Sequence, residues 1–227
     1  MFDPKALLDQ VLGGAGPDGQ RKGMSPEMIK GLAGGAALGG LAGILLGGKG
    51  AKKLATTALK VGGTAALAGL AYKAYNDWQA SKSGSTPPSG NDRPPPAEGT
   101  AFLPAIPKAR DDLSLSLLRA MIAAAKADGH IDGKEQQAIF AKLDALSLDT
   151  DAKAFVIDEL RKPLDIDAVV AGATSPEVAA EIYAASLLAV DADDPAEQAY
   201  LAMLAARLKL DAGLKTRIEQ EAAKALA

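Results

Sequence analysis

The sequence predicts an all-α protein, in which a glycine-rich membrane-associated helical region and a proline-rich linker precede a C-terminal bundle of seven helices. Three observations predict it: glycines spaced by four in an uncharged run, a proline-rich segment, and apolar residues that recur every three or four positions in the C-terminal half. No window alternates with a period of two, so no strand is expected. We divide the chain into residues 1–24, 25–78, 79–112 and 113–227.

The first region begins with a short amphipathic helix and continues as a flexible segment. Its apolar residues are Phe2, Leu7, Leu8, Val11 and Leu12. Acidic residues and the lack of an apolar core run exclude a signal peptide. We expect this helix to lie on a headgroup surface or to cap a partner.

Five glycines stand four residues apart in the second region. They are Gly31, Gly35, Gly39, Gly43 and Gly47. In water each interior glycine costs a helix about 1 kcal/mol relative to alanine. In lipid, glycines aligned on one helix face let a second backbone approach closely. The pattern predicts a glycine zipper that binds membrane lipid and forms a homo-oligomer through these helices.

A second apolar run follows at residues 54–72, interrupted by Lys60 and ending beside Tyr72, Tyr75 and Trp78. Such aromatic side chains are typical of membrane interfaces. The first run, residues 31–48, gives a helix of about 27 Å, slightly short of a ~30 Å hydrocarbon core. A two-pass hairpin, a buried hairpin in a soluble assembly and a glycine-rich disordered region all remain open. Lysines flank both runs, so the charges predict no orientation.

The third region is predicted to be a disordered, extended tether. It contains Pro87, Pro88, Pro94, Pro95, Pro96, Pro104 and Pro107. Proline-rich segments of this kind act as semi-rigid spacers. Phe102, Leu103 and Ile106 interrupt it, and we expect them to dock elsewhere on the protein.

Charge separates the two halves of the chain. Residues 1–78 carry nine Lys and Arg against five Asp and Glu, a net +4, which suits anionic headgroups. Residues 113–227 carry twelve against nineteen, a net −7, and this balance argues against nucleic acid as a partner. The seven helices are expected at 113–127, 133–146, 151–162, 165–172, 176–190, 195–209 and 211–226.

Two acidic turns carry the candidate metal ligands. The ligands are Asp128, Asp132 and Glu135 in the first turn, and Asp191 and Glu197 in the second. Clustered carboxylates are the usual ligands of hard cations, so a calcium or magnesium ion is one interpretation. The alternative is helix capping, in which an aspartate accepts from exposed amides and a glutamate three residues later reaches back. Neither turn has the spacing of an EF-hand.

Catalytic combinations are scarce. The chain has one histidine, His130, no cysteine and no Gly-x-Ser-x-Gly motif, so nucleophilic catalysis has no obvious residues. We therefore expect a non-enzymatic protein. A carboxylate-dependent metalloenzyme and a purely structural, self-associating protein are the alternatives.

The opening MFDPKALLDQ, the glycine-rich run, the proline-rich tether and KADGHIDGKE resemble the YebE-like family of bacterial inner-membrane proteins of unknown function. Residues 113–227 resemble the TerB-like domain of tellurite-resistance proteins, most specifically in Asp128, Gly129, Ile131, Asp132 and Glu135. The resemblance implies an inner-membrane location, a place in envelope stress response, and a partner protein or divalent cation at the acidic residues. We expect the C-terminal domain on the cytoplasmic side, although no sequence pattern identifies that side.

Overall fold

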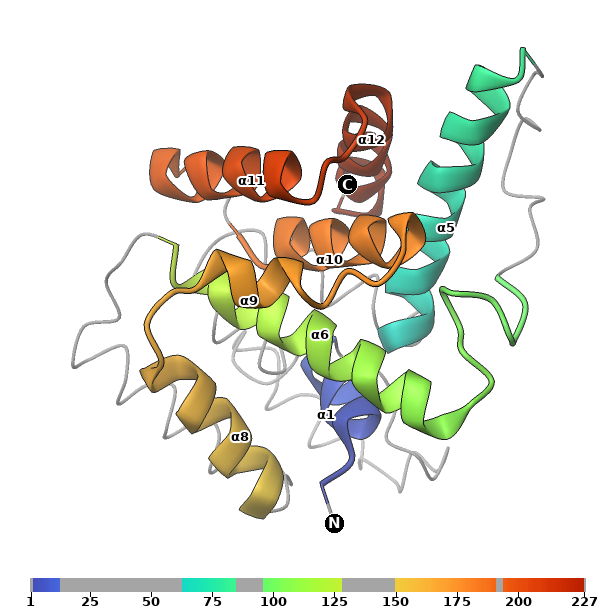
Figure 1. Cartoon of the computed structure of the whole chain (residues 1–227). Coiled ribbons are helices and arrows are strands. Elements are labelled where there is room, and N and C mark those ends of the chain that lie inside the picture. The colour runs from blue at the N-terminus through green and yellow to red at the C-terminus, as the bar shows by residue number, and fades with distance from the viewer. Residues whose placement is uncertain (1, 13–62, 85–95, 128–149, 191–193, 227) are drawn as a thin grey trace, which may run out of the picture.

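The computed structural model describes residues 2–12, 63–84, 96–127, 150–190 and 194–226. These residues contain eight helices and no strand, which confirms the all-α prediction (Figure 1). The helices are α1 (Pro4–Val11), α5 (Gly63–Lys82), α6 (Pro107–Ala125), α8 (Thr150–Arg161), α9 (Ile166–Val170), α10 (Pro176–Leu188), α11 (Pro195–Arg207) and α12 (Ala212–Leu226). The expected helix 133–146 lies outside the described residues.

Helix α10 is the centre of the fold. It packs against α5, α6, α11 and α12, and Figure 1 shows it lying above α6, with α5 and α12 near its right-hand end. Ser175 caps its start, where the hydroxyl accepts from the Val178 amide at 3.3 Å, and Pro176 occupies the first turn. Most of its side chains are buried, and many are alanines. A helix that is apolar on all sides is stable only inside a core, and small side chains let its neighbours come close.

Helix α1 belongs to the same core. Its apolar residues pack against α5 and α6, where Leu7, Leu8 and Val11 are almost completely buried. Phe2 stacks on Phe155 of α8, with ring centroids 5.1 Å apart. The amphipathic face predicted for this helix is thus covered by the protein itself.

Helix α5 contains residues that we expected in the membrane anchor and in the linker. It packs against α10 and α12, and burial of Leu67, Ala68 and Ala71 joins it to the common core. The expected boundaries after residues 78 and 112 fall inside α5 and α6. Other helices cover the apolar face of α5. A face covered by helices and a face covered by lipid are both apolar, so hydropathy alone does not distinguish them.

The predicted tether also contributes to the core. Phe102 is buried and meets Tyr72 and Tyr75 edge-on, with centroid distances of 5.5 and 5.8 Å. Tyr72 and Tyr75, which we assigned to a membrane interface, therefore hold Phe102 of the linker against α5. Of the three linker residues expected to dock, Phe102 docks fully, whereas Ile106 is exposed.

None of the helices in the described ranges combines the length and apolarity needed to cross a membrane. The five glycines of the predicted zipper, Gly31 to Gly47, lie outside the described residues.

Candidate functional site

The predicted metal ligands are only partly within the described residues. Asp128, Asp132, Glu135 and Asp191 lie outside them, and Glu197 lies in the first turn of α11. In the described part of the chain, no three His, Asp or Glu residues come close enough to share a metal ion. The calcium or magnesium site therefore stays a prediction.

The start of α11 shows how the second acidic turn is used. Asp194 accepts hydrogen bonds at its Oδ1 from the backbone amides of Ala196 at 2.8 Å and Glu197 at 3.1 Å. Pro195 follows it at the first helical position. This geometry is the N-cap that the capping interpretation predicts for Asp194.

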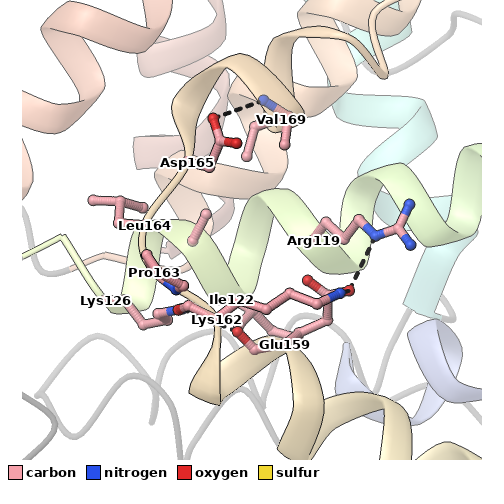
Figure 2. Close-up of a pocket in the computed structure, with 11 residues that line it drawn as sticks. Arg119, Ile122, Lys126, Glu159, Lys162, Pro163, Leu164, Asp165 and Val169 are labelled. Atoms are coloured by element: carbon pink, nitrogen blue, oxygen red, sulfur yellow. Dashed lines mark hydrogen bonds and ion pairs between the residues drawn. The ribbon is translucent and has the colours of Figure 1, made fainter.

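A pocket of about 420 Å³ lies between α6, the end of α8 and α9, and we call it the α6–α8–α9 pocket (Figure 2). Its lining residues are Arg119, Ile122, Ala123, Lys126, Glu159, Lys162, Pro163, Leu164, Asp165, Ala168 and Val169. None of them is among the site residues predicted from the sequence.

The chain forms this pocket because α8 and α9 are joined by a short extended segment. Pro163 follows α8 and cannot continue it, since proline lacks the amide hydrogen that a helix needs. Asp165 then caps α9, where its Oδ1 accepts from the amides of Asp167 at 3.0 Å and Ala168 at 3.1 Å. The segment between the two helices forms one wall of the pocket, and α6 forms the opposite wall.

Charged groups line the rim. Glu159 accepts at its Oε1 from Arg119 Nε at 3.3 Å and from Lys162 Nζ at 2.6 Å. The Glu159 side chain is mostly buried, whereas Arg119 and Lys162 keep about half of their surface exposed. One carboxylate thus holds two cations that still face solvent.

Lys126 lies on the same rim and has a different set of partners. Its Nζ donates to the backbone carbonyl of Glu159 at 3.0 Å and to that of Lys162. A cation is favourable there because the last carbonyls of a helix carry partial negative charge. Burial lowers the pKa of Lys126, and the nearby Glu159 carboxylate opposes this effect. With Asp165 included, the lining carries three cations and two carboxylates.

The base of the pocket is apolar. Ile122 and Val169 are buried there, while Leu164 at the edge is 40% exposed. An apolar base with a slightly positive rim suits an aliphatic group that carries a carboxylate. The residues come from three helices and a connecting segment, so no local motif reveals them. Pro163, which stops α8, is the sequence signal that could have indicated the wall.

A further polar group is buried in the core, away from this pocket. Glu181 of α10 is only 1% exposed, and its Oε2 has no hydrogen-bond partner. Burial raises the pKa of this carboxyl well above its usual value, because the charged form loses its hydration. Burial likewise raises the pKa of Tyr200 to about 12.

Comparison with known proteins agrees with the predicted resemblance to YebE-like proteins, which belong to a family of unknown function. A relative from Yersinia enterocolitica, described as an uncharacterized protein in the ampR 5' region, is 30% identical over 105 residues. The matched segment covers 46% of this chain and 76% of the relative. No solved structure matches the chain. The family model described as "Protein of unknown function (DUF533)" matches residues 31–222, most of the chain, and the protein therefore belongs to this family.

Proposed function

We propose that this protein is a non-enzymatic, membrane-associated module whose helical domain binds a partner protein at the α6–α8–α9 pocket. The observation that carries the proposal is the pocket's apolar base and slightly positive rim, in a C-terminal region whose net charge as a whole is −7. A TerB-like fold for residues 113–227 and a place in the bacterial inner membrane are parts of the same proposal, supported by the sequence resemblance.

The partner segment has an aliphatic side chain next to a carboxylate. The aliphatic group fits against Ile122 and Val169, and the carboxylate is attracted by Arg119 and Lys162. Both cations already share Glu159, so an incoming carboxylate gains from the excess positive charge rather than from a free cation. Because exposed ion pairs contribute only about 0–1 kcal/mol, most of the affinity comes from the apolar base, and weak, reversible binding is expected.

The test uses a fluorescently labelled tetrapeptide with adjacent leucine and glutamate, and a second peptide with glutamine in place of the glutamate. Fluorescence anisotropy with the purified full-length protein measures the affinity of each. We expect the glutamate peptide to bind several-fold more tightly, and this preference to disappear in Arg119→Gln and Lys162→Gln.

Lys215→Gln is the matched control, because Lys215 of α12 also pairs with a carboxylate, that of Glu219 at 2.9 Å, and does not line the pocket. Equal affinity for the two peptides, or an equal loss in the control, would contradict the proposal. Octanoate is tested as a competitor. Displacement of the peptide by octanoate at lower concentration than by unlabelled peptide would indicate a free acyl carboxylate as the ligand instead.

The N-terminal glycine-rich segment provides the membrane association and the self-association. If the glycines pack backbones together, Gly39→Leu combined with Gly43→Leu preserves membrane binding but weakens oligomer formation, because leucine blocks the close approach. Crosslinking in bilayers measures the oligomer. An unchanged yield of crosslinked oligomer would remove the zipper from the proposal.

A further inference from the structure

Lys126, which follows the last residue of α6, meets different partners from Lys162, the other lysine of the α6–α8–α9 pocket. The Lys126 Nζ donates to the backbone carbonyl of Glu159 at 3.0 Å and to that of Lys162. The Lys162 Nζ instead donates to the Glu159 carboxylate at 2.6 Å. A carboxylate stabilises an ammonium group in its charged form, whereas a carbonyl accepts from a charged or a neutral amine. Lys126 therefore depends less than Lys162 on carrying its charge.

The hydrogen bonds of Lys126 suit a neutral amine. An ammonium group has three hydrogens to donate and no lone pair. A neutral amine has two hydrogens and one lone pair, so it can donate to both carbonyls and still attack an electrophilic carbon. The two carbonyls belong to the end of α8 and to the residue before Pro163, which places the amine beside the segment that forms one wall of the pocket (Figure 2).

The surroundings of Lys126 favour loss of its proton. Burial lowers the pKa of this amine, because the ammonium form loses its hydration, and the Lys162 cation lowers it further. The Glu159 carboxylate opposes this shift, but Arg119 and Lys162 already pair with it. The carboxylate of Asp165, on the same lining, accepts from backbone amides at the start of α9. At neutral pH a larger share of Lys126 than of an exposed lysine is thus neutral and nucleophilic.

The apolar base of the pocket can hold a hydrocarbon chain next to this amine. Ile122 precedes Lys126 by four residues, so the two lie on one face of α6, and both line the pocket. Val169 and Leu164 complete the apolar surface. The pocket volume of about 420 Å³ lies within the range of small-molecule sites, about 300–1,000 Å³. Each methylene group that leaves water favours binding, so a longer chain should be held better than an acetyl group.

We propose that Lys126 is a modification site, at which its amine takes up a medium-length acyl group from an acyl thioester while the acyl chain lies on the apolar base of the pocket. The Nζ lone pair forms a bond to the thioester carbonyl carbon, and the carbon–sulfur bond breaks. The thiolate leaves and takes up the proton that the nitrogen loses. The products are an amide at Lys126 and a free thiol, so the step needs no oxidant or reductant.

Acylation at this position would regulate the binding of the partner segment. The amide is uncharged, so the lining would change from three cations and two carboxylates to two of each. The acyl chain would also occupy the base that the aliphatic side chain of the partner needs. This regulation rests on the proposed function, whereas the modification of Lys126 does not.

The test treats the full-length protein with S-octanoyl-N-acetylcysteamine and, separately, with its S-acetyl analogue. Peptide mass spectrometry measures the initial rate of acylation at Lys126, at Lys162 and at Lys215 of α12, which pairs with Glu219 at 2.9 Å outside the pocket. We expect octanoylation of Lys126 to be several-fold faster than that of the other two lysines. The acetyl thioester should show a smaller preference for Lys126, because it makes little use of the apolar base.

Leu164→Gln tests the place of the acyl chain. Leu164 lies at the edge of the pocket and is 40% exposed, so the substitution should leave the fold intact, which circular dichroism checks. We expect it to slow octanoylation of Lys126 several-fold and to leave acetylation unchanged. Met203→Gln is the matched control, because this methionine of α11 is 47% exposed and does not line the pocket.

The outcomes separate the modification from the regulation and from the proposed function. Equal octanoylation rates at Lys126, Lys162 and Lys215 overturn the modification site. Octanoylation of Lys126 that is as fast in Leu164→Gln as in Met203→Gln overturns the place of the acyl chain.

The leucine-glutamate peptide reports the regulation. We expect octanoylation to weaken its binding several-fold in the wild type and to leave the affinity of Lys126→Arg at its untreated value, because arginine is not acylated. Unchanged binding to the octanoylated wild type overturns the regulation. Failure of the untreated protein to bind the peptide overturns the proposed function and the regulation with it, while the acylation rates still decide the modification.

Discussion

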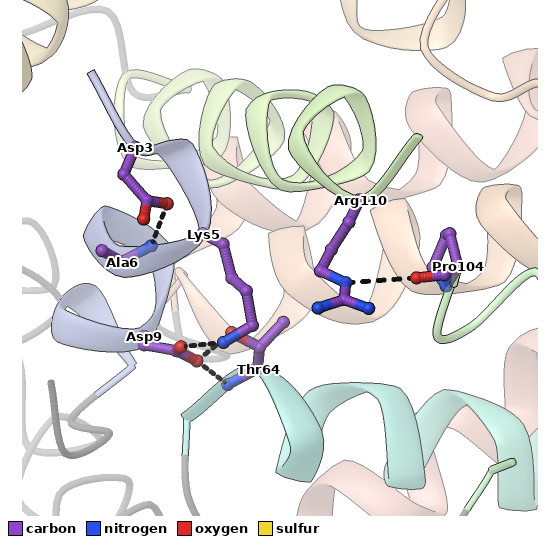
Figure 3. Close-up of polar contacts among 7 residues, drawn as sticks. All are labelled: Asp3, Lys5, Ala6, Asp9, Thr64, Pro104 and Arg110. Atoms are coloured by element: carbon purple, nitrogen blue, oxygen red, sulfur yellow. Dashed lines mark hydrogen bonds and ion pairs between the residues drawn. The ribbon is translucent and has the colours of Figure 1, made fainter. Parts of the chain in front are cut away.

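In two places a side chain from elsewhere in the chain forms a hydrogen bond with the end of a helix. Asp9 of α1 accepts from the Thr64 amide at the start of α5, which we call the α1–α5 contact (Figure 3), and Lys126 donates to the end of α8 in the α6–α8–α9 pocket. The two places differ in the apolar side chains that surround the hydrogen bond. Asp9 accepts from the start of α5 beside leucines that are fully buried, whereas Lys126 donates to the end of α8 beside Leu164, which is 40% exposed. In both places a backbone group at a helix end thus has a hydrogen-bond partner. The apolar packing closes the contact at Asp9 and leaves the one at Lys126 open to solvent.

The largest expected effect comes from breaking the closed contact. Leu8→Ala removes a side chain with no exposed surface and should lower the free energy of unfolding by about 2–5 kcal/mol. Leu164→Ala, the matched change at the pocket, should cost well under half as much, since its side chain is already partly hydrated. Urea unfolding of the full-length chain followed by circular dichroism measures both. Equal losses would remove the distinction between the two regions.

A smaller effect is expected from Glu181, whose side chain is buried in the core and whose Oε2 has no hydrogen-bond partner. Its pKa in the folded protein is raised above the unfolded value of about 4.3, so the folded state holds the proton more tightly. The resulting contribution to stability is complete below the unfolded pKa and is lost as the pH rises through the folded pKa.

Glu181→Gln should remove this loss of stability at higher pH, because glutamine does not ionise. The variant should therefore gain stability relative to the wild type between pH 4 and pH 8, measured as the urea midpoint at each pH. Glu159 is also mostly buried, but Arg119 and Lys162 pair with its carboxylate, so it serves as the comparison for a buried carboxyl that has partners. Parallel pH profiles for the wild type and Glu181→Gln would contradict a proton held at this site.

Local sequence signals predicted some helix starts, but not the contacts between distant segments. The starts expected at 176 and 195 are those of α10 and α11, where a cap and a first-turn proline act within a few positions, whereas α6 begins at Pro107 and not at the expected 113. The α6–α8–α9 pocket depends on Lys126 meeting backbone carbonyls 33 and 36 residues away, and no sequence spacing encodes that meeting. Hydropathy indicated that α5 is apolar, but it did not identify the helices that cover it.

An intermediate effect is expected at the cap of α11. Asp194→Ala should cost about 1 kcal/mol of stability, since two amides lose their acceptor, and Asp194→Asn should cost little. Thermal unfolding of the two variants side by side checks the difference. A large loss in Asp194→Asn would show that the charge of this residue matters beyond the cap.

The smallest expected effect is the response of the acidic turns to cations, which sharpens the comparison between capping and ligand binding. Asp194 is an N-cap, and Asp132 stands in the equivalent pattern, three residues before Glu135. If both turns only cap helices, calcium and magnesium should produce no saturable rise in melting temperature of the full-length protein. Asp132→Asn should then be mild, because asparagine caps about as well as aspartate.

Asp128 precedes that cap by four residues and has no part in it. A saturable rise that disappears in Asp128→Asn, but persists in Asp194→Asn, would therefore contradict capping and establish a cation site in the first turn.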